Sequence, residues 1–169
     1  MCLYTTNFKD PQHVADSLNA RTLLFLQLLV IRRFNLAMAE VLKGSCCCER
    51  CSFAVPAASI SFGFASCHCS LCRRIHASPI VLWSGMNASE SKDFVVTAPE
   101  GGIGAFRSSD SCTRYFCNNC GSHVYIKYDD GGSHQFAGEL HFPTSILDSR
   151  SLSILEKVSV ITFCVCVDY

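Results

Sequence analysis

The sequence predicts a mainly β fold of short strands, with one extra helix on the N-terminal side. Short β-prone segments alternate with turn residues through the middle of the chain, and clusters of closely spaced cysteines interrupt them. Apolar residues make up 49% of the 169 residues, which is enough for one domain with a buried core.

The expected elements follow from local patterns. A helix-like stretch covers residues 14–36, and one helical turn is expected over Ser70–His76. Residues 123–128 alternate well and stop at a strong turn signal, so residues 134–137 are expected to return as a hairpin partner. The other expected strands are 52–55, 59–65, 79–83, 94–97, 104–107 and 113–116.

Three regions are expected along the chain. Residues 1–39 form an N-terminal extension, residues 40–142 the zinc-binding domain, and residues 143–169 a divergent tail that ends in an apolar segment. The apolar run 23–31 is too short to span a bilayer and follows too many charged residues for a signal peptide. No membrane partner is therefore expected.

Charge and cysteine content narrow the function classes. The formal net charge is +0 and no basic stripe stands out, so no nucleic-acid partner is expected. The chain has 13 cysteines, an odd number, and Cys46, Cys47 and Cys48 are consecutive. Such close spacing rarely offers disulfide geometry but suits metal ligation in a reducing compartment, which predicts a cytoplasmic metalloprotein.

The first candidate metal site has four cysteines. Cys117 and Cys120 form a CxxC knuckle followed by Gly121, and two intervening residues let the chain curl round one ion. Cys46 and Cys48 are the expected second pair, because residues i and i+2 of an extended segment point to the same side. In the alternative, Cys47 or Cys51 is a ligand and another cysteine is spare.

The second candidate site has three cysteines, Cys67, Cys69 and Cys72, in a CxCxxC pattern. Three protein ligands with one exchangeable position is the pattern of catalytic zinc. The alternatives for a fourth ligand are His68, His76 and Cys112. Arg73 and Arg74 either offset the negative charge of three thiolates, bind a substrate carboxylate, or are solvated surface residues.

Three ordered blocks carry a family resemblance: Gly44–Cys48, Cys67–Arg74 and Arg114–Ser122. Together they resemble the signature of the glutathione-dependent formaldehyde-activating enzyme family, which also includes centromere protein V, and the resemblance covers roughly residues 40–142. It implies a β-tent fold, a structural zinc at Cys46, Cys48, Cys117 and Cys120, and a working zinc at Cys67, Cys69 and Cys72. The spacing argument reaches the same partition of the cysteines.

The chain also departs from the family pattern. Glu49 stands where glycine normally follows the first cysteine pair, and after Gly138–Leu140 the family's closing strand with its aromatic and histidine residues is not expected.

The resemblance implies a zinc-dependent carbon–sulfur lyase acting on a thiol–aldehyde adduct such as S-hydroxymethylglutathione, made from formaldehyde and glutathione. The alternative is a non-catalytic zinc-binding interaction module of the centromere protein V type. The expected partner is a small thiol or aldehyde substrate, and the oligomeric state is left open. Sequence candidates for a general base are Glu49, His76, Asp110 and His123.

Overall fold

A computed structural model describes residues 20–131 and 134–158 of the chain. The chain divides into two compact units, residues 1–35 and 36–169, and each is described by itself. Helix α2 spans Ala20–Met38, which confirms the expected helix over residues 20–36, while residues 14–19 lie outside the described part. No helix in the described residues is long and apolar enough to cross a membrane.

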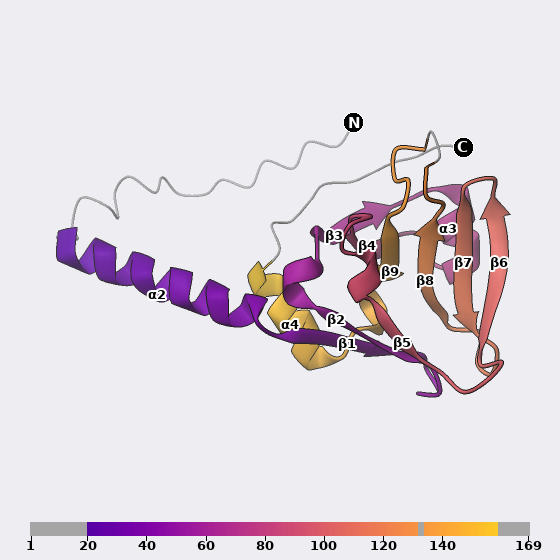
Figure 1. Cartoon of the computed structure of the whole chain (residues 1–169), viewed down its shortest axis with the longest axis horizontal. Helices are drawn as coiled ribbons and strands as arrows, with labels where there is room; N and C mark the ends of the chain where they lie inside the picture. Colours follow the sequence, from indigo (N-terminus) through magenta and orange to yellow (C-terminus); the bar gives the residue numbers. More distant parts are fainter. Residues whose placement is uncertain (1–19, 132–133, 159–169) are drawn as a thin grey trace. The chain divides into compact units, whose positions relative to one another are not determined.

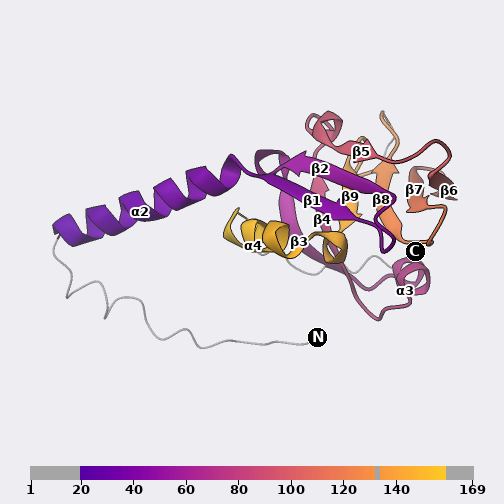
Figure 2. The same cartoon turned by 90° about the horizontal axis from the view of Figure 1, so that it is seen from below.

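The larger unit begins with a three-stranded antiparallel sheet. Its order is β1 (Val41–Ser45), β2 (Ser52–Pro56) and β5 (Val95–Thr97). β1 and β2 form a hairpin (Figure 2). In its register Leu42 lies opposite Val55 and Gly44 opposite Phe53. Leu42, Phe53 and Val55 are buried, as the alternation of a half-buried strand requires.

A six-stranded antiparallel sheet forms the rest of the domain, in the order β3–β4–β9–β8–β7–β6 (Figure 1). The two sheets and few helices confirm the expected mainly β class. The strand bounds are Phe62–Cys67 for β3, Val81–Met86 for β4, Leu140–Pro143 for β9, His123–Tyr128 for β8, Cys112–Cys117 for β7 and Ile103–Ser109 for β6.

Strand β9 corrects two sequence predictions. Residues 134–137 were expected to pair with β8, but they form a turn in which the Ala137 N–H donates to the His134 carbonyl. Gly138 then adopts a φ of 78°, a left-handed conformation that glycine accepts without steric cost, and the chain enters β9. β9 is the closing strand that was not expected from the sequence, and it lies between β4 and β8.

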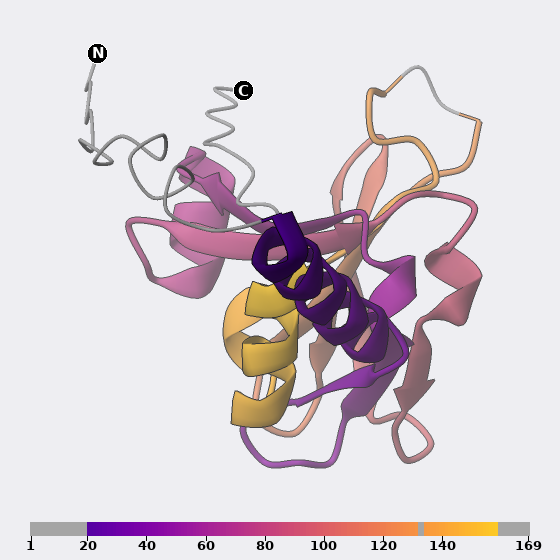
Figure 3. The ribbon, with the colours of Figure 1, turned by 90° about the vertical axis from the view of Figure 1, so that its left-hand side faces the viewer.

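The main core lies where β1, β2, β4, β9 and helix α4 (Ser149–Val158) meet. Leu140 and Phe142 of β9 and Ile154 and Leu155 of α4 belong to it. Helix α4 packs against β1 and β3 (Figure 3). The Asp148 carboxylate accepts a 2.7 Å hydrogen bond from the Ser151 N–H and so caps α4. Burial of α4 favours a domain limit later than residue 142, while the three-region division stays a prediction.

A second, smaller core gathers beside helix α3 (Ser70–His76), whose bounds agree with the predicted helical turn. Val81 and Trp83 of β4 and Ile126 and Tyr128 of β8 pack there. The alternation of β4 thus divides its side chains, with Trp83 facing this cluster and Met86 facing the main core. The remaining members of the second core are Cys69, Cys72 and Cys112.

Candidate active site and metal centres

Four cysteine sulfurs meet where the β1–β2 turn approaches the turn between β7 and β8. The Sγ atoms of Cys46, Cys48, Cys117 and Cys120 all lie within 4.8 Å of one another. Cys46 and Cys48 are 3.5 Å apart at their sulfurs, and Cys48 and Cys117 are 3.7 Å apart. Sulfurs at tetrahedral positions about 2.3 Å from a zinc ion would lie about 3.8 Å apart, so these four fit a closed zinc site.

The local geometry that joins Cys46 to Cys48 differs from the expected extended segment. Residues 47–50 form a turn, in which the Glu49 N–H donates to the Cys46 carbonyl at 2.9 Å. Glu49 has a φ of 60°, in the left-handed region that favours glycine. The sulfurs therefore converge because the chain turns, and the glutamate stands in a strained position.

The surroundings of this cluster favour thiolates at its knuckle. Backbone N–H groups, first that of Cys120, lower the pKa of Cys117. The Cys120 sulfur lies 3.2 Å from the Ser122 hydroxyl, which lowers the pKa of Cys120 to about 5. Burial raises the pKa of Cys46, although the Cys51 N–H donates to its sulfur at 3.3 Å.

The two spare cysteines of this region lie outside the four-sulfur group. Cys47 is exposed. Cys51 is buried, its thiol donates to the Gly102 carbonyl at 3.3 Å, and burial raises its pKa to about 12. Cys51 is thus placed as a protonated neighbour of the cluster, and the assignment of the four ligands stays a prediction.

The second cluster forms where β3 ends and α3 begins. Cys67 closes β3, Cys69 is the N-cap of α3, and Cys72 lies in its first turn. The Cys69 sulfur accepts a 3.3 Å hydrogen bond from the Cys72 N–H, so the helix cap itself brings these two residues together. All three sulfurs lie within 4.8 Å of one another.

The surroundings of the second cluster shift the pKa values of Cys72 and Cys67 in opposite directions. Hydrogen bonding with Cys67 lowers the pKa of Cys72 despite burial, and the nearby charge of Arg114 lowers it further. The same interaction with Cys72, together with burial, raises the pKa of Cys67. Among these thiols Cys72 therefore loses its proton more readily than Cys67.

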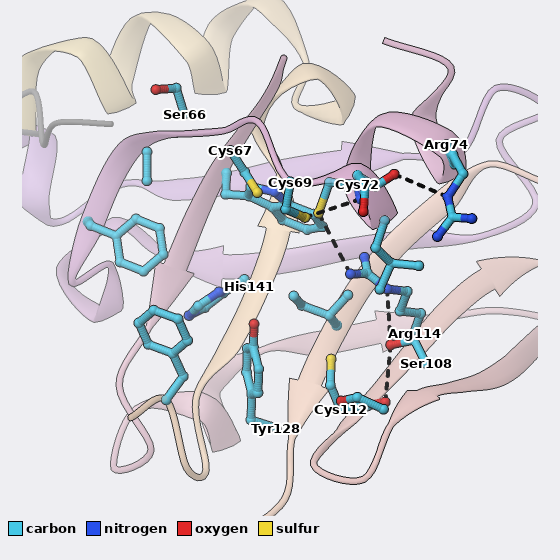
Figure 4. A pocket seen from close by; sticks show the side chains of 18 residues that line it. Ser66, Cys67, Cys69, Cys72, Arg74, Ser108, Cys112, Arg114, Tyr128 and His141 are labelled. Carbon is cyan, nitrogen blue, oxygen red and sulfur yellow. Dashed lines mark hydrogen bonds between the residues drawn. The ribbon is translucent and has the colours of Figure 1, made fainter. Parts of the chain in front are cut away.

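The three sulfurs open into a cavity of about 540 Å³ (Figure 4). This volume lies in the range that small-molecule sites occupy. In Figure 4 the sulfurs lie between His141 on one side and Arg114 on the other, with Tyr128 below. Much of the wall is aromatic and apolar, from Phe62, Trp83, Ile126, Tyr128 and Phe136. Among the described residues, no aspartate or glutamate lines this cavity.

Arg114 is the buried cation of the cavity, with 6% of its surface exposed. Its Nη2 lies 3.7 Å from the Cys72 sulfur, its Nε donates to the Ser108 hydroxyl at 3.1 Å, and its guanidinium lies 6.0 Å above the Trp83 ring. Its Nη1 is buried and has no hydrogen-bond partner among the described residues. A buried cation without a carboxylate is costly, so it requires a negative charge beside it. Three thiolates around one divalent ion would supply it.

The four sequence candidates for a general base do not line the cavity. Glu49 and Asp110 are exposed and line no part of the cavity. His76 and His123 are hydrogen-bonded to each other at 2.8 Å beside Trp83, and burial lowers their pKa values to about 4 and about 3.

Only some of the other residues considered for the second site line the cavity. Arg74 and Cys112 line the cavity, whereas Arg73 and His68 do not. None of the alternative fourth ligands, His68, His76 or Cys112, belongs to the sulfur cluster that the described residues form.

Sequence reasoning missed His141, which lines the cavity beside Tyr128. Its Nε2 lies 2.7 Å from the Glu139 carboxylate. The signal was present, because Leu140 and Phe142 flank His141 in an apolar–polar–apolar alternation typical of a strand. This segment has only four residues, however, which is too short for the alternation alone to predict a strand.

The profile of the family described as glutathione-dependent formaldehyde-activating enzyme matches residues 41–157, which include both cysteine clusters and α4. The chain belongs to the glutathione-dependent formaldehyde-activating enzyme family. The match begins at β1 and ends in α4, so the family segment includes the cavity walls as well as the cysteines.

A curated relative agrees with this family assignment. An uncharacterized lyase of Schizosaccharomyces pombe is 32% identical over 73 residues, which cover 41% of this chain and 47% of that protein. The chain therefore matches about half the length of this relative. Family membership and the name of the relative support a formaldehyde-activating or lyase-like role, and the cysteine clusters suggest zinc.

Proposed function

We propose that the protein is a zinc-dependent carbon–sulfur lyase that interconverts a thiol–aldehyde adduct of the S-hydroxymethylglutathione type with its thiol and aldehyde. The observation that carries the proposal is the opening of a three-cysteine cluster into a cavity of about 540 Å³. A metal site that serves only the fold has no need of such a space, and the other cluster has four sulfurs.

The two clusters would have different roles. Cys46, Cys48, Cys117 and Cys120 would hold a structural zinc, and Cys67, Cys69 and Cys72 a second zinc with one exchangeable position. Zinc bound there would supply Lewis acidity and stabilise a substrate thiolate. The ten described cysteines are all free thiols, which supports a reducing compartment, and we propose the cytoplasm.

The cavity residues of this chain would bind and orient the adduct. The aromatic wall offers an apolar surface and excludes water from the reacting carbon. Arg114 would balance the negative charge near Cys72, and its Nη1 would donate to the oxygen of the adduct. Arg74, which also lines the cavity, would balance the charge of the departing thiolate.

Two measurements test this function. The purified protein should contain about two zinc ions, and NMR exchange spectroscopy should show that it accelerates the exchange of formaldehyde with a thiol such as glutathione. Acceleration that depends on the second zinc supports the lyase. Two zinc ions without acceleration for any thiol would contradict the lyase and favour the non-catalytic binding module.

A further inference from the structure

The wall of the cavity opposite Arg114 contains a buried histidine on the central strand β9. Leu140 and Phe142 of this strand point into the main core, so the pleat directs His141 to the other face of the sheet. His141 is buried, with 7% of its side chain exposed, and it lines the cavity that the second cysteine cluster also lines.

The Glu139 carboxylate fixes the tautomer of this histidine. His141 Nε2 lies 2.7 Å from Glu139 Oε2, and an ionised carboxylate can only accept a hydrogen bond. When the imidazole is neutral and the carboxylate ionised, Nε2 carries the proton and donates it, which leaves a lone pair on Nδ1. A histidine paired with a carboxylate in this way is oriented to accept a proton on its other nitrogen.

The ring of His141 is also held in place by packing. It meets Phe62, Tyr128 and Phe136 edge-on, with ring centroids 4.9 to 5.3 Å apart. Gly85 lies opposite it on β4, and a Cβ atom there would lie 2.6 Å from His141 Cδ2 and would also collide with Phe62. The absence of a side chain at Gly85 thus gives the histidine its position.

We propose that His141 is the catalytic base of the cavity and that Glu139 is its positioning residue, an inference that rests on the proposed function. In breakdown of the adduct R–S–CH₂–OH, the hydroxyl proton passes to His141 Nδ1. The O–H electron pair forms the C=O bond of formaldehyde, and the C–S pair leaves with sulfur as the thiolate. In the forward direction His141 returns the proton to the oxygen as the thiolate attacks the aldehyde carbon.

The groups around His141 define its pH dependence. The titratable or charged side chains that lie beside it or line the same cavity include Glu139, Tyr128 on β8, His134 in the preceding turn, Cys67 at the end of β3 and Arg114 on β7. Phe62 and Phe136, whose rings also contact His141, carry no charge. The nearest carboxylate in this group is Glu139, so its removal should change both the tautomer and the pH profile.

The experiment compares the variants His141→Gln and Glu139→Gln with the wild-type protein loaded with zinc. For His141→Gln we expect kcat to fall by about 10²-fold or more, with the pH dependence of kcat flattened and the KM for the thiol little changed. For Glu139→Gln we expect a smaller fall and a shifted pH profile. ¹⁵N NMR should place the proton on Nε2 in the wild type and show mixed tautomers in Glu139→Gln.

Asp130→Asn is the matched control, because it removes a carboxylate from the loop after β8 that is 78% exposed. It should keep the wild-type kcat and pH profile. Zinc stoichiometry separates a structural effect from a chemical one, and if His141→Gln fails to fold, Glu139→Gln carries the test.

Two outcomes would overturn the inference, and they are distinguishable. If the variants keep two zinc ions, the wild-type kcat and the wild-type pH profile, His141 is not the base although the lyase function stands. If the wild-type protein accelerates no thiol–aldehyde exchange, the proposed function fails and this inference fails with it.

Discussion

The two cysteine clusters differ in one ligand and in what lies beside them. The first gathers four sulfurs from two hairpin turns, one in each sheet, whereas the second gathers three from one strand end and the helix that follows. The first spans 74 positions of sequence between Cys46 and Cys120, and the second only five between Cys67 and Cys72. A metal that closes a long loop contributes its binding free energy to folding. A metal held by a local cluster beside a cavity contributes less to folding and can contact a substrate.

The largest expected contrast comes from removing one sulfur from each cluster. Cys117→Ser should abolish cooperative unfolding or lower stability by more than about 5 kcal/mol, because structural zinc contributes folding free energy directly. Cys69→Ser should keep the fold, because serine is a good N-cap for α3, while zinc falls from about two ions to about one and activity is lost. Metal analysis and thermal unfolding measure both effects.

The exposed Cys47→Ser is the control for this pair and should change neither the zinc content nor the stability. A Cys117→Ser protein that unfolds like the wild type would break the proposed division between a structural and a working cluster.

The second prediction concerns Arg114, which contacts only the open cluster. Arg114→Gln should weaken zinc at that cluster by about 10- to 100-fold, because the buried thiolates lose their neighbouring cation. Arg114→Lys should restore part of the affinity. Trp83, the single tryptophan of the chain, lines the same cavity, so its fluorescence should report thiol binding in each variant.

Arg107→Gln is the matched control, since this arginine lies on the neighbouring strand β6 and pairs with Asp129 at the surface. Equal zinc affinity in the Arg114→Gln and Arg107→Gln proteins would show that Arg114 does not balance the charge of the cluster.

The members of both cysteine clusters could be predicted from the sequence, because ligand spacing is a local property. The CxCxxC and CxxC patterns identify the sulfurs that the fold brings together, and the bounds of α3 and β8 follow from short-range pattern. The cavity wall could not be predicted in this way. The position of His141 in the cavity depends on the pairing of β9 with β4 and β8, which are distant in sequence. The role proposed for Arg114 depends on its burial beside Cys72.

The third prediction uses the His76–His123 pair, which links α3 of the second cluster to β8 just after the knuckle of the first. Burial lowers both folded-state pKa values below the ordinary value of 6.5, to about 4 and about 3. Below pH 6.5 the unfolded chain binds protons that the folded chain does not. Stability should therefore be lost as pH falls from about 6.5 towards 4, by about 1.4 kcal/mol per pH unit for each histidine.

Denaturant unfolding between pH 7.5 and pH 5 measures this slope, with zinc content followed in parallel. His123→Gln should show a shallower slope, whatever its stability at pH 7.5. An unchanged slope would mean that the pair is not the origin of the pH dependence.

The smallest expected effect on stability comes from relieving backbone strain beside each cluster. Among the described residues, two that are not glycine have a positive φ. Glu49 has a φ of 60° after the first cysteine pair, and Ala77 has a φ of 47° at the end of α3. Each substitution, Glu49→Gly and Ala77→Gly, should raise the free energy of unfolding by about 1 kcal/mol, because glycine adopts this conformation without strain. Chemical denaturation measures both.

A matched glycine substitution at the exposed Lys92, where φ is not positive, should not stabilise the protein. Destabilisation by Glu49→Gly would show that the glutamate side chain contributes more than its backbone strain costs.

The place of β9 in the sheet also has a consequence for protein synthesis. β4 ends at Met86 and its neighbour β9 begins at Leu140, so residues 87–139 must be made before the two strands can pair. At about 5 to 20 residues per second, the ribosome needs roughly 3 to 10 s for this stretch. β4 has an unpaired edge throughout that interval, and β8 has one once residues 123–128 have been made. Such edges can join other chains, so we expect the nascent protein to depend on chaperones until residue 143 has emerged.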